Sequence, residues 1–135
     1  MPQPQITPYR KAELTEYGTM SLGALINALE STKDDALVYF DFCGFTPGEI
    51  DSYRGYYDHL AIEPLRGVSA PSVAQFISSL RDCEANTYTG YKGGDYTMDL
   101  ETPIWVSFYG SVSGTGIVSI DDQGCCVILV TANID

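Results

Sequence analysis

Two short amphipathic segments constrain the fold of this chain more than any other sequence feature. In residues 21–29 and 72–80, apolar side chains recur every three or four positions, which is the period of an α-helix buried along one face. Ser21 stands where an N-cap is expected, and Ser72 with Gln75 matches a capping box. Helices this short are marginal alone, so each must pack its apolar face against another element. Their apolar positions are alike, which we interpret as a shared requirement of short capped helices; an internal duplication is the alternative.

Most other apolar residues fall in β-rich runs, which supply that second element. The last run contains Val127-Ile128-Leu129-Val130, which is apolar on both faces and indicates a central strand covered on both sides. We therefore predict an α+β fold with an antiparallel or mixed sheet of about five strands and two short amphipathic helices. Residues 1–135 are expected to form a single domain, with residues 1–20 as an irregular N-terminal arm or short edge strand. The predicted strands are residues 36–42, 57–62, 104–109, 116–120 and 125–131.

The charge balance limits the partners of this protein. Eighteen Asp and Glu against seven Lys and Arg give a net charge of −11, which opposes binding to a nucleic-acid backbone or an anionic membrane. No apolar run approaches the roughly 18 residues of a membrane span, and residues 1–5 lack the features of a signal peptide. We therefore expect a cytoplasmic protein with no nucleic-acid or membrane partner.

The motif inventory argues against an enzyme. The sequence has no G-x-S-x-G, Walker or H-E-x-x-H motif. Its single histidine, His59, has no nucleophile marked near it, and we interpret it as a hydrogen-bonded strand residue. The pairs Asp34-Asp35 and Asp121-Asp122 fall in predicted turns, where Asp serves the backbone and solvent. We predict no catalytic residues.

The four cysteines indicate neither a metal site nor a disulfide framework. Cys43, Cys83, Cys125 and Cys126 form no C-x-x-C pair, and His59 is distant from all of them in sequence. Cys125 and Cys126 are adjacent in a predicted strand, so their side chains should face opposite sides of the sheet. We expect four reduced thiols, no metal and no cofactor.

Two tyrosine-rich segments carry the candidate ligand site. Each contains a Tyr-basic-Gly triplet followed closely by an aspartate, in residues 51–59 and 88–96. Tyrosine rings offer stacking faces, Arg and Lys bind phosphate, and glycines let backbone N–H groups approach an anion. Such groups suit a planar anionic ligand of nucleotide type. The predicted binding residues are Tyr53, Arg54, Tyr56, Tyr57, Asp58, His59, Tyr91, Lys92, Gly93, Gly94, Asp95 and Tyr96. The alternative is that these are ordinary half-exposed loops in which Arg54 and Lys92 pair with the aspartates.

The segments SYRGYYDHLA and TGYKGGDYTM, with much of the chain from Ser21 onward, resemble small uncharacterised bacteriophage-encoded proteins. That family has no assigned activity, so the resemblance supplies no functional residues. It implies a phage protein acting in the cytoplasm of an infected bacterium.

Two hypotheses of function follow. The first is a counter-defence protein, expected as a homo-oligomer, that sequesters a small nucleotide-type immune signal without cleaving it. The second is an acidic protein that inhibits a host defence complex, of CRISPR or nuclease type, by direct protein–protein binding. An enzyme that degrades a nucleotide, using His59 with Asp58 or Asp95, ranks below both.

Overall fold

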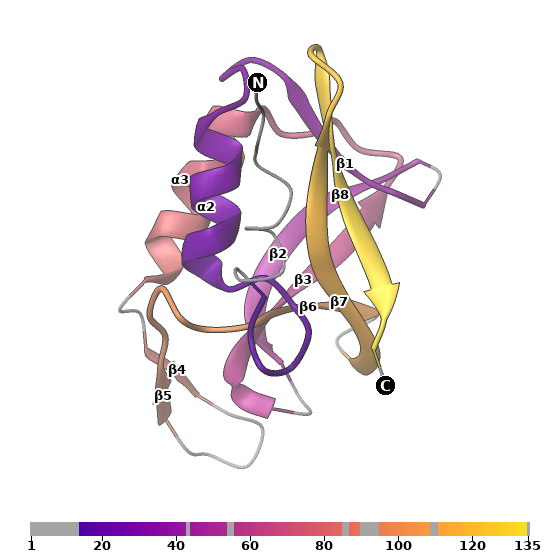
Figure 1. The fold of residues 1–135 in the computed structure, drawn as a ribbon. Coiled ribbons are helices and arrows are strands. Elements are labelled where there is room, and N and C mark those ends of the chain that lie inside the picture. The colour runs from indigo at the N-terminus through magenta and orange to yellow at the C-terminus, as the bar shows by residue number, and fades with distance from the viewer. Residues whose placement is uncertain are drawn as a thin grey trace, which may run out of the picture.

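The computed structural model describes residues 14–42, 44–53, 56–84, 87–89, 95–108 and 111–134 of the 135-residue chain. These residues form an α+β fold with a mixed sheet, which confirms the predicted fold class (Figure 1). The helices are α2 (Leu22–Glu30) and α3 (Val73–Cys83). The strands are β1 (Leu37–Phe40), β2 (Phe45–Tyr53), β3 (Tyr56–Arg66), β4 (Thr87–Thr89), β5 (Asp95–Thr97), β6 (Ile104–Phe108), β7 (Ser111–Asp122) and β8 (Cys126–Asn133).

Six strands make the main sheet, in the order β1-β8-β7-β6-β3-β2, and β4 and β5 form a separate antiparallel hairpin. The pairs β1–β8 and β3–β6 are parallel, and the other neighbours in the main sheet are antiparallel. The sequence predicts about five strands; it misses β2 in the main sheet and both strands of the β4–β5 hairpin. Gly44, Pro47 and Gly48 suggest a break at β2, but β2 ends the strand order, where a proline is tolerated.

The main sheet curls until its two end strands, β1 and β2, contact each other. Thr46 Oγ1 in β2 donates a hydrogen bond to the carbonyl oxygen of Val38 in β1 at 2.8 Å. Val38 N in turn donates to the carbonyl oxygen of Pro71 at 3.0 Å. The edge of β1 is therefore covered from within the chain, which reduces the strand edge open to a second copy. The homo-oligomer stays a prediction, which light scattering tests.

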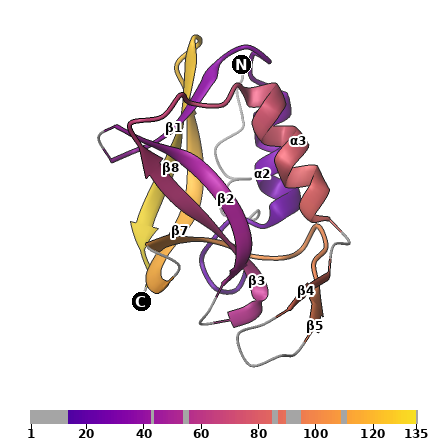
Figure 2. The ribbon, with the colours of Figure 1, turned by 180° about the vertical axis from the view of Figure 1, so that it is seen from behind.

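The two helices lie side by side against the sheet in both views (Figures 1 and 2). Both predicted caps are confirmed: Ser21 Oγ accepts from Ala24 N, and Ser72 and Gln75 form the reciprocal capping box. Neither helix in the described part of the chain has the length and apolar character needed to cross a membrane. The buried helix residues are Leu22, Leu25, Ile26, Leu29, Val73, Phe76, Leu80 and Cys83.

The paired residues of β3 and β6, Leu60 to Ile62 and Ile104 to Val106, are buried on both faces of the sheet. Leu60 and Ile104 point into the main core, together with the apolar faces of the helices. Ala61 and Trp105, the next residues in each strand, form a second cluster with Tyr53. Since successive side chains of a strand alternate between faces, this second cluster lies on the outer face of the sheet.

Candidate functional site

An aromatic layer on the outer face of the sheet lies beside the candidate site. The Tyr53 ring stacks on the Trp105 indole with 5.0 Å between ring centroids and 6° between planes. Tyr53 is only 1% exposed, and its hydroxyl accepts a hydrogen bond from Gly114 N at 2.9 Å. Tyr53 and Trp105 therefore act as packing residues that hold β2, β6 and β7 together.

His59 extends this layer toward the surface. Trp105 Nε1 donates to His59 Nδ1 at 3.0 Å, and the two rings are parallel within 6°. Because Nδ1 accepts this hydrogen bond, it carries no proton and is occupied. The Tyr17 and His59 rings pack in a T-shaped arrangement with 4.6 Å between centroids. His59 is thus a hydrogen-bonded strand residue, as its sequence context predicts. Its ring also packs against the Tyr17 ring.

Tyr17 is presented by a closed turn of residues 15–19. Thr15 N donates to the carbonyl oxygen of Thr19 at 2.6 Å, and Gly18 N donates to that of Thr15 at 2.9 Å. Gly18 has a φ of +89°, a conformation that favours glycine. Met20 then bridges the sheet, since its N–H donates to Ile117 O and its carbonyl accepts from Ile104 N. The turn is therefore fixed to β6 and β7.

A second turn, residues 99–102, lies opposite the first. Asp99 Oδ1 accepts from Glu101 N at 2.8 Å, and Thr102 Oγ1 accepts from Asp99 N at 2.9 Å. The first turn of α2 holds this segment, because Leu22 N donates to Thr102 O and Gly23 N to Leu100 O, both at 2.8 Å. Both turns are therefore held by backbone hydrogen bonds before any ligand arrives.

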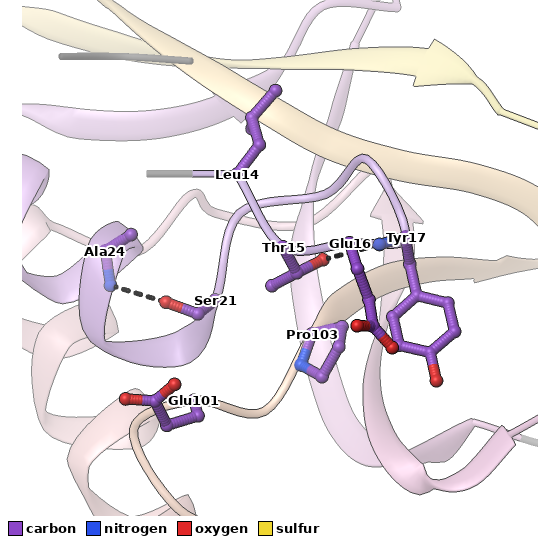
Figure 3. A pocket seen from close by; sticks show the side chains of 8 residues that line it. All are labelled: Leu14, Thr15, Glu16, Tyr17, Ser21, Ala24, Glu101 and Pro103. Carbon is purple, nitrogen blue, oxygen red and sulfur yellow. Dashed lines mark hydrogen bonds between the residues drawn. The ribbon is translucent and has the colours of Figure 1, made fainter. Parts of the chain in front are cut away.

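Between these turns lie two adjoining hollows, of about 480 Å³ and about 260 Å³, which share Tyr17, Glu101 and Pro103; together they are called the Tyr17 hollow. Figure 3 shows Pro103 in the larger hollow between Glu101 on one side and Glu16 with Tyr17 on the other. The full lining is Leu14, Thr15, Glu16, Tyr17, Ser21, Ala24, His59, Thr97, Asp99, Glu101, Thr102 and Pro103.

The Tyr17 hollow is acidic. Glu16, Asp99 and Glu101 are all exposed, and the described lining contains no Lys or Arg. Tyr17, which is 37% exposed, adds an aromatic ring that attracts cations. The hollow therefore suits an ammonium or guanidinium group and opposes an anion.

The N-termini of the two helices do not offer a phosphate site. In α2 the first N–H groups are taken by Thr102 O, Leu100 O and Ser21 Oγ. In α3 they donate to carbonyl oxygens of residues 34 and 36 and to Ser72 Oγ. With these donors satisfied inside the chain, neither helix end presents the free N–H groups that anion binding uses.

The predicted ligand residues separate into three groups. Tyr53 and His59 are buried in the aromatic layer, so the expected stacking face of Tyr53 is covered by Trp105. The structure describes only the backbone of Tyr56, Tyr57, Asp58, Asp95 and Tyr96, which lie in β3 and β5. Arg54, Tyr91, Lys92, Gly93 and Gly94 lie outside the described residues.

The structure does bring the two tyrosine-rich segments to one end of the molecule. They form the hairpins β2–β3 and β4–β5, where Tyr53 faces Tyr56 and Tyr88 faces Tyr96 across the strands. Strand β4 contacts β2, and β5 contacts β3 (Figures 1 and 2). The described residues of both segments therefore lie in paired strands, and these strands are neighbours in space.

The Tyr17 hollow itself was not predicted from the sequence. Its acidic residues come from segments more than eighty positions apart, 16–17 and 99–101, neither of which carries a catalytic motif. The available signals are local: Asp99 and Thr102 have the spacing of a side-chain-stabilised turn, and Gly18 marks a turn after Tyr17. Within the described residues, no three His, Cys, Asp or Glu side chains form a group that could hold a metal ion.

Comparison of the chain with protein-family models, with curated proteins and with solved structures finds no match in any of the three. The class of protein is therefore defined by the fold and by the chemistry of the site. It is an α+β protein whose curled mixed sheet carries a preformed acidic hollow beside a buried aromatic layer.

Proposed function

We propose that this protein is a binding protein that engages a basic segment of a partner protein through the Tyr17 hollow. The observation that carries the proposal is the lining, in which three carboxylates surround an exposed tyrosine and no described lining residue is basic. The net charge of −11 adds long-range attraction for a basic partner. The sequence resemblance to bacteriophage proteins makes a host defence complex the expected partner, with its nucleic-acid-binding surface as the basic segment.

Each carboxylate and the Tyr17 ring should contribute moderately to the binding free energy of the basic segment. Exposed ion pairs contribute about 0–1 kcal/mol each, and an exposed cation–π contact contributes about 0.5–1 kcal/mol. Removing one carboxylate should therefore weaken binding by up to about fivefold, and removing two by up to about 25-fold. Salt screens these charge interactions, so the affinity should also fall as the salt concentration rises.

The experiment titrates an arginine-rich peptide into the protein by calorimetry at low salt. The test variant is Glu16→Gln with Glu101→Gln, since both side chains line the hollow. The control variant is Glu49→Gln with Glu84→Gln, which makes the same change in charge at exposed positions outside the hollow lining. The proposal predicts that only the test variant loses affinity. Equal losses in both variants, or no binding by the unaltered protein, would overturn it.

A second candidate function is sequestration of a nucleotide-type ligand at the paired hairpins. The observation that favours it is the contact of β4 with β2 and of β5 with β3, since these strands flank the two Tyr-basic-Gly triplets in sequence. Calorimetry against cyclic dinucleotides, cyclic oligonucleotides and ADP-ribose derivatives tests it. Arg54→Ala and Lys92→Ala should each then weaken binding at least about tenfold, with the ligand recovered intact. Absence of heat with every nucleotide excludes this candidate.

A further inference from the structure

Two adjacent thiols lie at the turn between β7 and β8. The sequence predicts that Cys125 and Cys126 face opposite sides of a strand, but β8 begins only at Cys126, so Cys125 belongs to the turn. Because Cys125 precedes the strand, strand alternation does not by itself fix how the two side chains point, and the expectation of opposite faces stays a prediction.

The turn keeps this pair accessible. Cys125 is exposed and Cys126 is half-buried. Gln123 N donates to the carbonyl oxygen of Cys126 at 2.9 Å, and Gly124 has a φ of +86°, which folds the chain tightly before the cysteines. The Cys126 thiol donates weakly to Gln123 Oε1 at 3.5 Å. Cys83 differs, because it is buried in α3 and donates to the carbonyl oxygen of Ser79 at 3.3 Å.

We propose that Cys125 and Cys126 form a vicinal dithiol modification site that reacts with small disulfides, such as oxidised glutathione, and closes to a disulfide. The Cys125 thiolate attacks one sulfur of oxidised glutathione, forming a mixed disulfide and releasing one glutathione thiolate. The Cys126 thiolate then attacks the Cys125 sulfur and releases the second glutathione thiolate. The two thiol protons pass to solvent, so two protein thiols are oxidised and one glutathione disulfide is reduced.

The order of attack follows from the surroundings of the two thiols. Desolvation, the neighbouring Cys125 thiol and the Asp121 carboxylate raise the pKa of the Cys126 thiol. Because Cys125 is exposed and Cys126 is half-buried, a disulfide in solution reaches Cys125 first, and Cys125 makes the first attack. Once Cys125 carries glutathione, Cys126 is the adjacent thiol and reacts within the same molecule.

Formation of the Cys125–Cys126 disulfide would affect the first residues of the β1–β8 pairing. Leu37 N donates to the carbonyl oxygen of Cys125 at 3.1 Å, and Leu37 is the register partner of Cys126. The disulfide would restrict the backbone dihedrals of the peptide between the two cysteines. This would change the geometry of the hydrogen bond from Leu37 N to the Cys125 carbonyl oxygen, which holds the start of β1. We expect faster amide exchange at Leu37 in the oxidised protein.

Trypsin digestion followed by mass spectrometry tests the proposal without altering the chain. The folded protein is incubated with oxidised glutathione, remaining thiols are alkylated, and the protein is cut after Lys and Arg. No Lys or Arg follows Lys92, so residues 93–135 form one tryptic peptide holding Cys125 and Cys126 and no other cysteine. The proposal predicts that this peptide loses about 2 Da, and that a reductant reverses the loss. Cys83, in residues 82–92, is the internal control and should remain reduced.

Two serine variants test the order of attack. Cys126→Ser should stop at the mixed disulfide, so the 93–135 peptide gains about 305 Da of glutathione. Cys125→Ser should remain largely unmodified. Retention of the glutathione adduct on the unaltered protein would overturn the proposal, and so would an unmodified 93–135 peptide after the incubation.

Discussion

The substitution Tyr53→Phe distinguishes a packing role for Tyr53 from a ligand-binding role. It removes only the hydroxyl, and it keeps the ring that stacks on Trp105 at 5.0 Å. That hydroxyl accepts a hydrogen bond from the buried Gly114 N–H at 2.9 Å. Leaving a buried N–H without this acceptor costs about 1–3 kcal/mol of unfolding free energy. For a chain of 135 residues, that corresponds to a fall in Tm of about 3–15 °C.

Urea denaturation measures the loss of unfolding free energy in Tyr53→Phe. The transition is followed by the fluorescence of Trp105, the single tryptophan. The midpoint should fall while the slope stays constant, since the surface exposed on unfolding is unchanged. Tyr39→Phe is the matched control, because Tyr39 is half-buried in β1 and its hydroxyl forms no hydrogen bond within the described part of the chain. It should change stability by less than about 0.5 kcal/mol. An unchanged midpoint for Tyr53→Phe, with weakened nucleotide binding, would refute the packing role.

Three further predictions follow from individual contacts. Ser72→Ala breaks the capping box of α3 and should cost about 1 kcal/mol by urea denaturation, whereas Ser78→Ala on the exposed face of α3 should cost less than about 0.5 kcal/mol. Gly116→Ala places a Cβ 2.5 Å from Thr19 Cγ2 and 2.6 Å from Ile134 Cδ1, so overpacking should cost about 1–3 kcal/mol; an unchanged Tm would contradict the close packing of the 15–19 turn on β7. Because the pKa of Cys126 is raised, its thiolate forms at higher pH, and its iodoacetamide alkylation should rise later with pH than that of an unfolded control peptide.

Local patterns in the sequence predict the helices well. The spacing of apolar residues and the serines at 21 and 72 identify both helices, because capping and amphipathicity depend on residues within a few positions of each other. The strands are predicted less completely. Strand β2 is missed because Pro47 and Gly48 resemble a break, and only the position of β2 at the end of the sheet order makes them acceptable.

The candidate site depends on contacts between distant residues, which local patterns do not contain. Tyr53 is predicted as a ligand residue from its neighbours Arg54 and Gly55, but its partner is Trp105, fifty-two positions away. The strand pairing β6-β3-β2 creates that contact. The Tyr17 hollow likewise forms only when residues 15–19 and 99–102 dock on the same end of α2 and β6.

Backbone amide chemical-shift mapping with the arginine-rich peptide tests the central claim most directly, because it locates the bound peptide on the folded protein. We predict shifts at residues 15–17 and 99–102, with a shift of the single indole N–H of Trp105, which donates to His59 beneath Tyr17. Shifts confined to the β2–β3 and β4–β5 hairpins, or small shifts spread over all acidic surfaces, would contradict binding at the Tyr17 hollow.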